Sequence, residues 1–131
     1  MEPAGQPSEE AGPLAGLCVL VVEDDYFVAN ESAKVLRDHG ARVLGPVPDM
    51  DRARCLLSEE EPDCVLLDVN LKGEFVYPLA ADLLHRGIPA AFTTGYDASF
   101  LPPELRGMPC LQKPVETREL IRLVKSLADG E

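Results

Sequence analysis

Carboxylates and one lysine follow short apolar runs along the chain, in places where they could act together on a phosphate group. Glu23, Asp24 and Asp25 end one apolar run, and Asp68 ends another. Carboxylates gathered without bases repel one another, and a hard divalent cation with oxygen ligands relieves that repulsion. Mg²⁺ is the usual ion where carboxylates work on phosphate. If these acids meet in space, they therefore predict a magnesium site.

The remaining polar groups suit the negative oxygens of a phosphoryl group. Thr93 and Thr94 end a third apolar run, and Lys113 follows a fourth, shorter one. A lysine and a hydroxyl can both donate hydrogen bonds to phosphoryl oxygens. Each residue has an ordinary explanation when it stands alone, because strand-end acids often cap helices and lysines are usually solvated. The functional hypothesis therefore depends on all of them meeting at one place.

The elements that must position these groups alternate between short apolar runs and helical stripes, a pattern typical of βαβ units on a parallel sheet. The apolar runs predict strands at 17–22, 43–45, 64–67, 89–94 and 110–112. Apolar residues at helical spacing predict helices over 28–36, 50–57, 76–84 and 120–127, with Asp49 as an N-cap and Gly87 as a C-terminal stop. A further helix is expected within 97–107, weak or irregular because of Pro102 and Pro103.

This order of elements predicts a doubly wound, three-layer α/β domain with a five-stranded parallel sheet in the order 2-1-3-4-5. Ligands of such sheets bind beyond the carboxyl ends of the strands, where the strand order reverses. In that order the first and third strands are neighbours. The acids after Val22 are therefore expected to face the acid after Leu67.

Length and composition limit the function classes. The 131 residues suit one domain at 17–128, between a flexible N-terminal tail at 1–16 and a C-terminal tail at 129–131, with no room for an output domain. A formal charge of −11 argues against a nucleic-acid partner. No apolar run reaches the roughly 18–20 residues that cross a bilayer, and no signal peptide begins the chain, so the cytoplasm is expected. The spacing of the four cysteines matches neither a zinc ribbon nor a redox pair, which indicates reduced thiols.

Four short motifs occur in order, each at the carboxyl end of an expected strand: Val21-Val22-Glu23-Asp24, Leu67-Asp68-Val69-Asn70, Thr94-Gly95-Tyr96 and Lys113-Pro114. Together they resemble the CheY-like receiver domains of response regulators, and the resemblance covers nearly all of residues 17–128. It implies a two-component phosphorelay protein rather than a conventional enzyme. Its phosphoryl donor would be a sensor histidine kinase or a phosphotransfer protein, and it would signal through contact with a downstream protein.

The resemblance also implies roles for single residues. Asp68 is the phosphoacceptor, and Mg²⁺ is held by Asp24, by an oxygen of Asp68 and by the backbone carbonyl of Asn70. Glu23 acts on the ion through water. Asp25 lies one place beyond the acidic pair of the family.

On the same grounds, Thr94 is the switch hydroxyl, and Lys113 pairs with the phosphoryl group. The bond before Pro114 is expected to be cis. Thr93 is then an ordinary strand residue.

One position departs from the family pattern, because Cys110 stands where receivers usually have a switching Tyr or Phe. The run from Ile88 to Tyr96 resembles a receiver subfamily nicknamed FATGUY, with a Pro-x-x-Phe-x-Thr-Gly-Tyr core, which also lacks that aromatic residue. Its members are often stand-alone receivers partnered with HWE-type histidine kinases. The resemblance leads us to expect signalling through ordering of residues 96–108.

Two other function classes share the chemistry or the fold. A haloacid-dehalogenase-like phosphohydrolase has its nucleophile after the first strand and a second acid two residues on, a context that Glu23-Asp24-Asp25 lacks. A flavodoxin-like binding module needs a phosphate-binding loop rich in Ser, Thr and Gly, where this chain has acids. Within the receiver hypothesis, the sequence leaves open an adaptor, a phosphate sink and a fragment of a larger protein.

Overall fold

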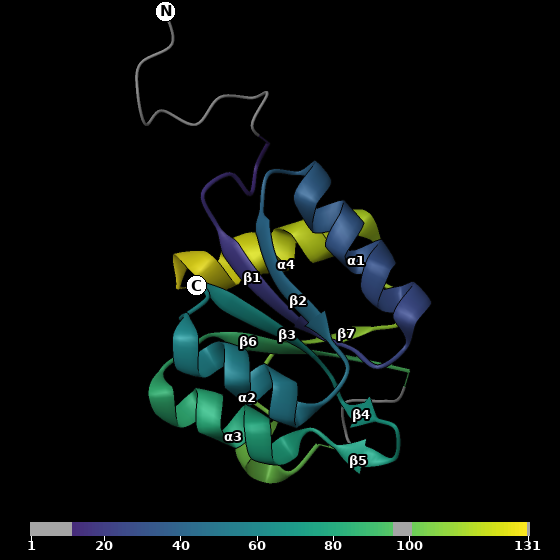
Figure 1. Ribbon diagram of the computed structural model, residues 1–131, viewed down its shortest axis with the longest axis vertical. Coiled ribbons are helices and arrows are strands. Elements are labelled where there is room, and N and C mark those ends of the chain that lie inside the picture. The colour runs from purple at the N-terminus through teal and green to yellow at the C-terminus, as the bar shows by residue number, and fades with distance from the viewer. Residues whose placement is uncertain (1–11, 96–100, 131) are drawn as a thin grey trace, which may run out of the picture.

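Five parallel strands form the central sheet of the computed structural model, which describes residues 12–95 and 101–130 (Figure 1). They are β1 (Cys18–Val22), β2 (Arg42–Val47), β3 (Cys64–Asp68), β6 (Ala90–Thr94) and β7 (Cys110–Gln112). Their order is β2-β1-β3-β6-β7. Counted along the chain, this is the order 2-1-3-4-5, so the predicted sheet is confirmed.

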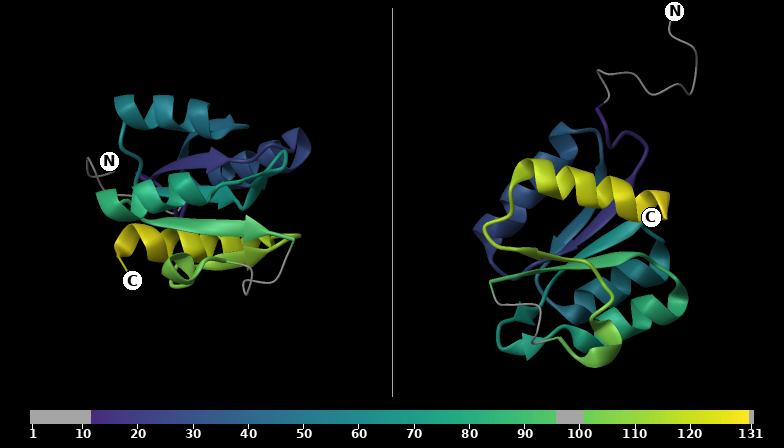
Figure 2. Two further views of the ribbon diagram at one scale, coloured as in Figure 1. Left: turned by 90° about the horizontal axis from the view of Figure 1, so that it is seen from below. Right: turned by 180° about the vertical axis from the view of Figure 1, so that it is seen from behind.

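Helices cover both faces of the sheet (Figures 1 and 2). α1 (Tyr26–Asp38) and α4 (Thr117–Asp129) pack on one apolar cluster, which contains Leu36 and Leu120. α2 (Met50–Glu59) and α3 (Tyr77–Arg86) pack on the opposite cluster. Every residue of β3 is buried, because the central strand lies between the two helical layers. The three-layer α/β architecture is therefore confirmed.

Local sequence signals fix two of the helix ends as predicted. The Asp49 side chain caps α2 by accepting a hydrogen bond from the Arg52 N–H at 2.8 Å. Gly87 ends α3 with a left-handed φ of 73°, a conformation that favours glycine. No helix in the described part of the chain is long and apolar enough to cross a membrane.

Strand β2 is longer than the predicted strand at 43–45, because it continues through Pro46 to Val47. The pairing register between β1 and β2 shifts between Leu20 and Val22, near the carboxyl ends of the two strands. Proline lacks an N–H donor, so it is tolerated on an edge strand or at a bulge, and β2 is an edge strand. The predicted end of this strand at residue 45 is therefore wrong.

A single 3₁₀ turn, η2 (Pro103–Leu105), occupies the place of the weak helix predicted within 97–107. Residues 97–100 lie outside the described residues. Leu105 is buried in the same apolar cluster as α2 and α3, so this turn still covers the sheet. Adjacent prolines at 102 and 103 prevent a regular helix here.

The packed part of the chain begins earlier than the predicted boundary at residue 17. Leu14 is fully buried in the cluster under α1 and α4, and its N–H donates to the carbonyl of His39 at 2.8 Å. Gly12 has a φ of 91°, and a Cβ on it would lie 2.3 Å from the same carbonyl oxygen. Residues 12–16 are therefore part of the folded body, and only residues 1–11 of the predicted tail lie outside the described residues.

Candidate functional site

Three acids meet at the carboxyl end of the sheet. Val22 of β1 and Leu67 of β3 are partners in the parallel pairing, so the residues that follow them leave the sheet side by side. One carboxylate oxygen from each of Glu23, Asp24 and Asp68 lies within 4.8 Å of the others. Glu23 and Asp68 are buried, and Asp24 is half-buried. The structure thus brings together the acids that the sequence places after separate strands.

Lys113 enters the same cluster from the segment after β7. Its Nζ lies 2.7 Å from Glu23 Oε1 and 3.3 Å from Asp68 Oδ2. Its backbone N–H donates to the carbonyl of Thr94 at 2.8 Å, which ties the end of β6 to this segment. The Lys113–Pro114 bond is cis, as expected, and Gly45–Pro46 is cis as well. One ammonium group therefore forms ion pairs with two buried carboxylates.

The pKa values of the buried groups reflect this crowding. The pKa of Asp68 is raised from 3.8 to about 7, mainly by burial and also by the hydrogen bond and the charge of Glu23. Lys113 and the Asn70 N–H act in the opposite direction. Burial lowers the pKa of Lys113, but Glu23 and Asp68 together outweigh it, so that pKa stays above its usual value. The cluster therefore has unrelieved negative charge that a further cation would stabilise.

The oxygens of this cluster fit a small divalent ion. All the side-chain donors are carboxylates, which are the hard ligands that Mg²⁺ prefers. Asp24 is half-buried, which leaves an approach from solvent. The Asn70 N–H donates to Asp68 Oδ1 at 3.3 Å, so the segment after β3 remains beside the acids.

The other predicted residues lie around the cluster rather than in it. The exposed Asp25 caps α1 by accepting from the Val28 N–H at 3.1 Å, which is its ordinary role. Thr94 is buried at the end of β6. Thr93 lines a groove beside Val115 and Leu120, on the face covered by α1 and α4.

A small hairpin beside the acids is absent from the sequence prediction. β4 (Asn70–Leu71) and β5 (Glu74–Phe75) pair antiparallel across the turn Lys72-Gly73. The Lys72 N–H donates to Asp24 Oδ2 at 2.9 Å, and the Gly73 N–H donates to Asn70 Oδ1 at 2.7 Å. A glycine at the second turn position was the one signal in the sequence, because two-residue strands are too short to show a period.

Comparison with known proteins identifies the family. Residues 19–125 match the family model of the response regulator receiver domain. The chain belongs to this family. Receiver domains of two-component systems interact with histidine kinases or phosphotransfer proteins, and they are signalling domains rather than conventional enzymes.

Relatives of this receiver domain include regulators and solved receiver structures. It is 29% identical over 122 residues to the transcriptional regulatory protein YbdJ of Bacillus subtilis, covering 88% of this chain and 52% of that protein. The chain spans about half the length of the curated relatives it matches. SdrG from Sphingomonas melonis is 29% identical with a TM-score of 0.74, over 85% of this chain and 95% of that one. A response regulator receiver protein from Burkholderia phymatum is 27% identical with a TM-score of 0.75, over 86% and 95% of the two chains.

Proposed function

We propose that this receiver domain is a magnesium-dependent phosphoacceptor, in which Asp68 takes a phosphoryl group from a histidine kinase or a phosphotransfer protein. The proposal is carried by one observation: the Asp68 carboxylate lies in a single cluster with Glu23, Asp24 and Lys113. A nucleophilic carboxylate, two further acids for a divalent ion and one ammonium group are the parts that phosphoryl transfer needs.

In the proposed reaction, an oxygen of Asp68 attacks the phosphorus of a phosphorylated donor histidine. The new O–P bond forms as the P–N bond breaks, and the released imidazole nitrogen takes up a proton. When bound, Mg²⁺ supplies positive charge to the attacking carboxylate and the transferring oxygens. Lys113, already 3.3 Å from Asp68 Oδ2, donates to a phosphoryl oxygen.

The remaining residues position the ion or transmit the effect of phosphorylation to other segments. Asp24, Asp68 and the backbone carbonyl of Asn70 would hold the ion directly, and Glu23 would act on it through water. Thr94, at the end of β6, donates its hydroxyl to the phosphoryl group. Because the Lys113 N–H donates a hydrogen bond to the Thr94 carbonyl, a movement of Thr94 also moves the segment after β7.

We further propose a stand-alone cytoplasmic receiver of the FATGUY subtype, paired with an HWE-type kinase. The sequence run Ile88–Tyr96 and the cysteine at position 110 support this subtype. Cys110 is the register partner of Phe92, so the usual switching aromatic is missing at the position beside β6. The output would then depend on residues 96–108, of which 96–100 lie outside the described residues.

Phosphorylation by a small-molecule donor tests the proposed function directly. Acetyl phosphate and Mg²⁺ should add one labile phosphoryl group to the wild type, measured by intact mass, and none to Asp68→Asn. Asp25→Asn is a matched control, because asparagine caps a helix as well as aspartate does and Asp25 lies outside the cluster. This control should gain the group at the wild-type rate. An equal gain in Asp68→Asn would refute the assignment.

A further inference from the structure

The turn of the β4–β5 hairpin has an unusual backbone. Lys72 has a φ of 53° and Gly73 a φ of 90°, and Lys72 is the one non-glycine residue with positive φ among the described residues. Two consecutive positive φ values are the mark of a type I′ turn, whose twist suits a two-residue hairpin. An L-residue with a side chain such as lysine holds this conformation at a cost. Something in the surrounding structure must therefore favour it.

Two backbone N–H groups of the turn donate to side chains beside the proposed ion: one to the ligand Asp24, and one to the side chain of Asn70, whose backbone carbonyl is the other proposed ligand. Lys72 N–H lies 2.9 Å from Asp24 Oδ2, and Gly73 N–H lies 2.7 Å from Asn70 Oδ1. Asp24 is exposed enough to turn toward solvent, and the hydrogen bond to Lys72 restrains it. Asp24 has a second carboxylate oxygen, which remains available to an ion.

We infer that the β4–β5 hairpin is a positioning element for the ion, in which Lys72 orients Asp24 and Gly73 holds Asn70. The inference rests on the proposed function, since it concerns how the same site is preorganised. Lys72 and Gly73 touch no reacting atom and act through the two ligands. A fixed ligand loses less conformational freedom when the ion binds, so the hairpin raises the affinity for Mg²⁺.

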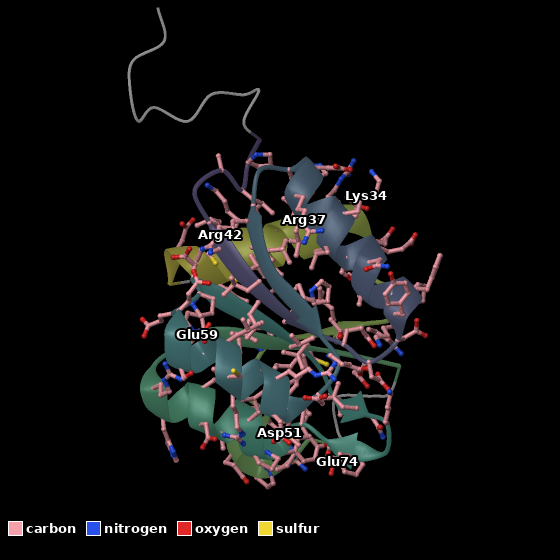
Figure 3. All side chains as sticks on the ribbon, in the orientation of Figure 1. Lys34, Arg37, Arg42, Asp51, Glu59 and Glu74 are labelled. Atoms are coloured by element: carbon pink, nitrogen blue, oxygen red, sulfur yellow. The ribbon has the colours of Figure 1, made fainter. Side chains whose placement is uncertain are left out.

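An aromatic series fixes the outer strand of the hairpin. The Phe75 ring stacks on the Tyr77 ring with 5.1 Å between centroids, and Tyr77 meets the buried Phe92 edge-on at 6.5 Å. Phe75 is 52% exposed, so the stack leaves this side chain in contact with solvent. Glu74, its neighbour on β5, is exposed (Figure 3). The stack therefore joins the hairpin to β6 without any contribution from the acids.

A matched pair of glycine substitutions tests the inference. Gly73→Ala and Gly87→Ala both place a methyl group in open space at a positive φ, 90° and 73° respectively. Both put a similar backbone strain on the folded protein, but only in Gly73→Ala can the metal-free hairpin relieve it by moving its N–H groups away from Asp24 and Asn70, a movement that Mg²⁺ binding must reverse. Only Gly73→Ala should weaken Mg²⁺ binding, by about three- to tenfold, when affinity is measured by calorimetric titration.

A second pair removes the aromatic support and leaves the turn intact. Phe75→Ala should weaken Mg²⁺ binding, whereas Leu84→Ala, equally exposed at 51% on α3, should leave it unchanged. Amide exchange at residues 72–75 should slow when Mg²⁺ is added to the wild type, because coupling between ligand and hairpin is reciprocal.

A gain-of-affinity variant keeps the test decisive if Gly73→Ala fails to fold. Lys72→Asn creates Asn-Gly, the preferred type I′ pair, while Lys72→Gln removes the same charge without the preference. Lys72→Asn should bind Mg²⁺ more tightly than Lys72→Gln. Equal affinities in this pair, or an unchanged affinity in Gly73→Ala, would overturn the inference. A wild type that binds no Mg²⁺ would instead overturn the proposed function.

Discussion

The ammonium group of Lys113 is paired with the buried carboxylate of Glu23, with 2.7 Å between Nζ and Oε1. Asp68 Oδ2 lies 3.3 Å from the same nitrogen, so this pair also partly neutralises the proposed phosphoacceptor. Before phosphorylation, the lysine is therefore held by the acids of the site. A phosphoryl group on Asp68 would offer it a more highly charged partner.

Removing Lys113 should expose the repulsion between the acids. Lys113→Gln leaves Glu23 and Asp68 without a cation, and we expect the free energy of unfolding in metal-free buffer to fall by on the order of 1–3 kcal/mol. Urea denaturation measures the change. The control is Lys34→Gln, since Lys34 forms an exposed pair with Asp38 on α1 (Figure 3) and should cost less than about 0.5 kcal/mol. Equal costs for the two variants would contradict an electrostatic role for Lys113.

The pKa of Asp68 predicts how stability depends on pH without metal. In the unfolded chain this carboxyl titrates near 3.8, and in the folded protein at about 7. Between these values the folded state binds the proton more tightly, so rising pH favours unfolding. Thermal denaturation in EDTA should show the wild type losing about 1–3 kcal/mol between pH 4.5 and pH 7.5 relative to Asp68→Asn, which cannot titrate there. A pH-independent difference between the two proteins would show that Asp68 is already charged at acid pH.

Mg²⁺ should restore the stability that is lost at neutral pH, and this effect should depend on Asp24. At an ion concentration of 100 times the dissociation constant, binding to the folded state alone adds about 2.7 kcal/mol of stability. Asp24→Asn keeps an oxygen that can accept from the Lys72 N–H but loses the charge, so Mg²⁺ should stabilise it far less. Asp25→Asn should respond as the wild type does, because Asp25 caps α1. A full response in Asp24→Asn would exclude this side chain as a ligand.

The sequence predicts the sheet and the meeting of the acids because both depend on strong local signals. Residues 17–22 and 64–67 are continuously apolar, as strands buried on both faces must be, and each run ends directly in an acid. Once these two strands are neighbours, the position of Glu23, Asp24 and Asp68 follows from geometry. The strand order therefore determines where most of the site residues lie.

Features that depend on a few residues or on distant contacts could not be predicted in this way. The β4–β5 hairpin has two-residue strands, which show no period, and its turn is stabilised by Asp24 from another segment. For the hairpin, the decisive interaction is invisible in the sequence pattern because it joins two separate segments. The irregular element η2 is different, because Pro102 and Pro103 are local signals against a regular helix and the sequence predicts the weakness from them.

The boundary of the folded body gives the last prediction. Leu14 lies among prolines and glycines, a composition that suggests a tail, yet its side chain is fully buried beside Leu36 and Leu120. Leu14→Ala should lower the free energy of unfolding by about 2–4 kcal/mol, since a buried leucine leaves a cavity when truncated. Leu84→Ala, half exposed on α3, provides the control and should cost less than about 1 kcal/mol. If the two variants unfold at the same urea concentration, residues 12–16 contribute nothing to the core, and the domain begins at residue 17 as the composition suggests.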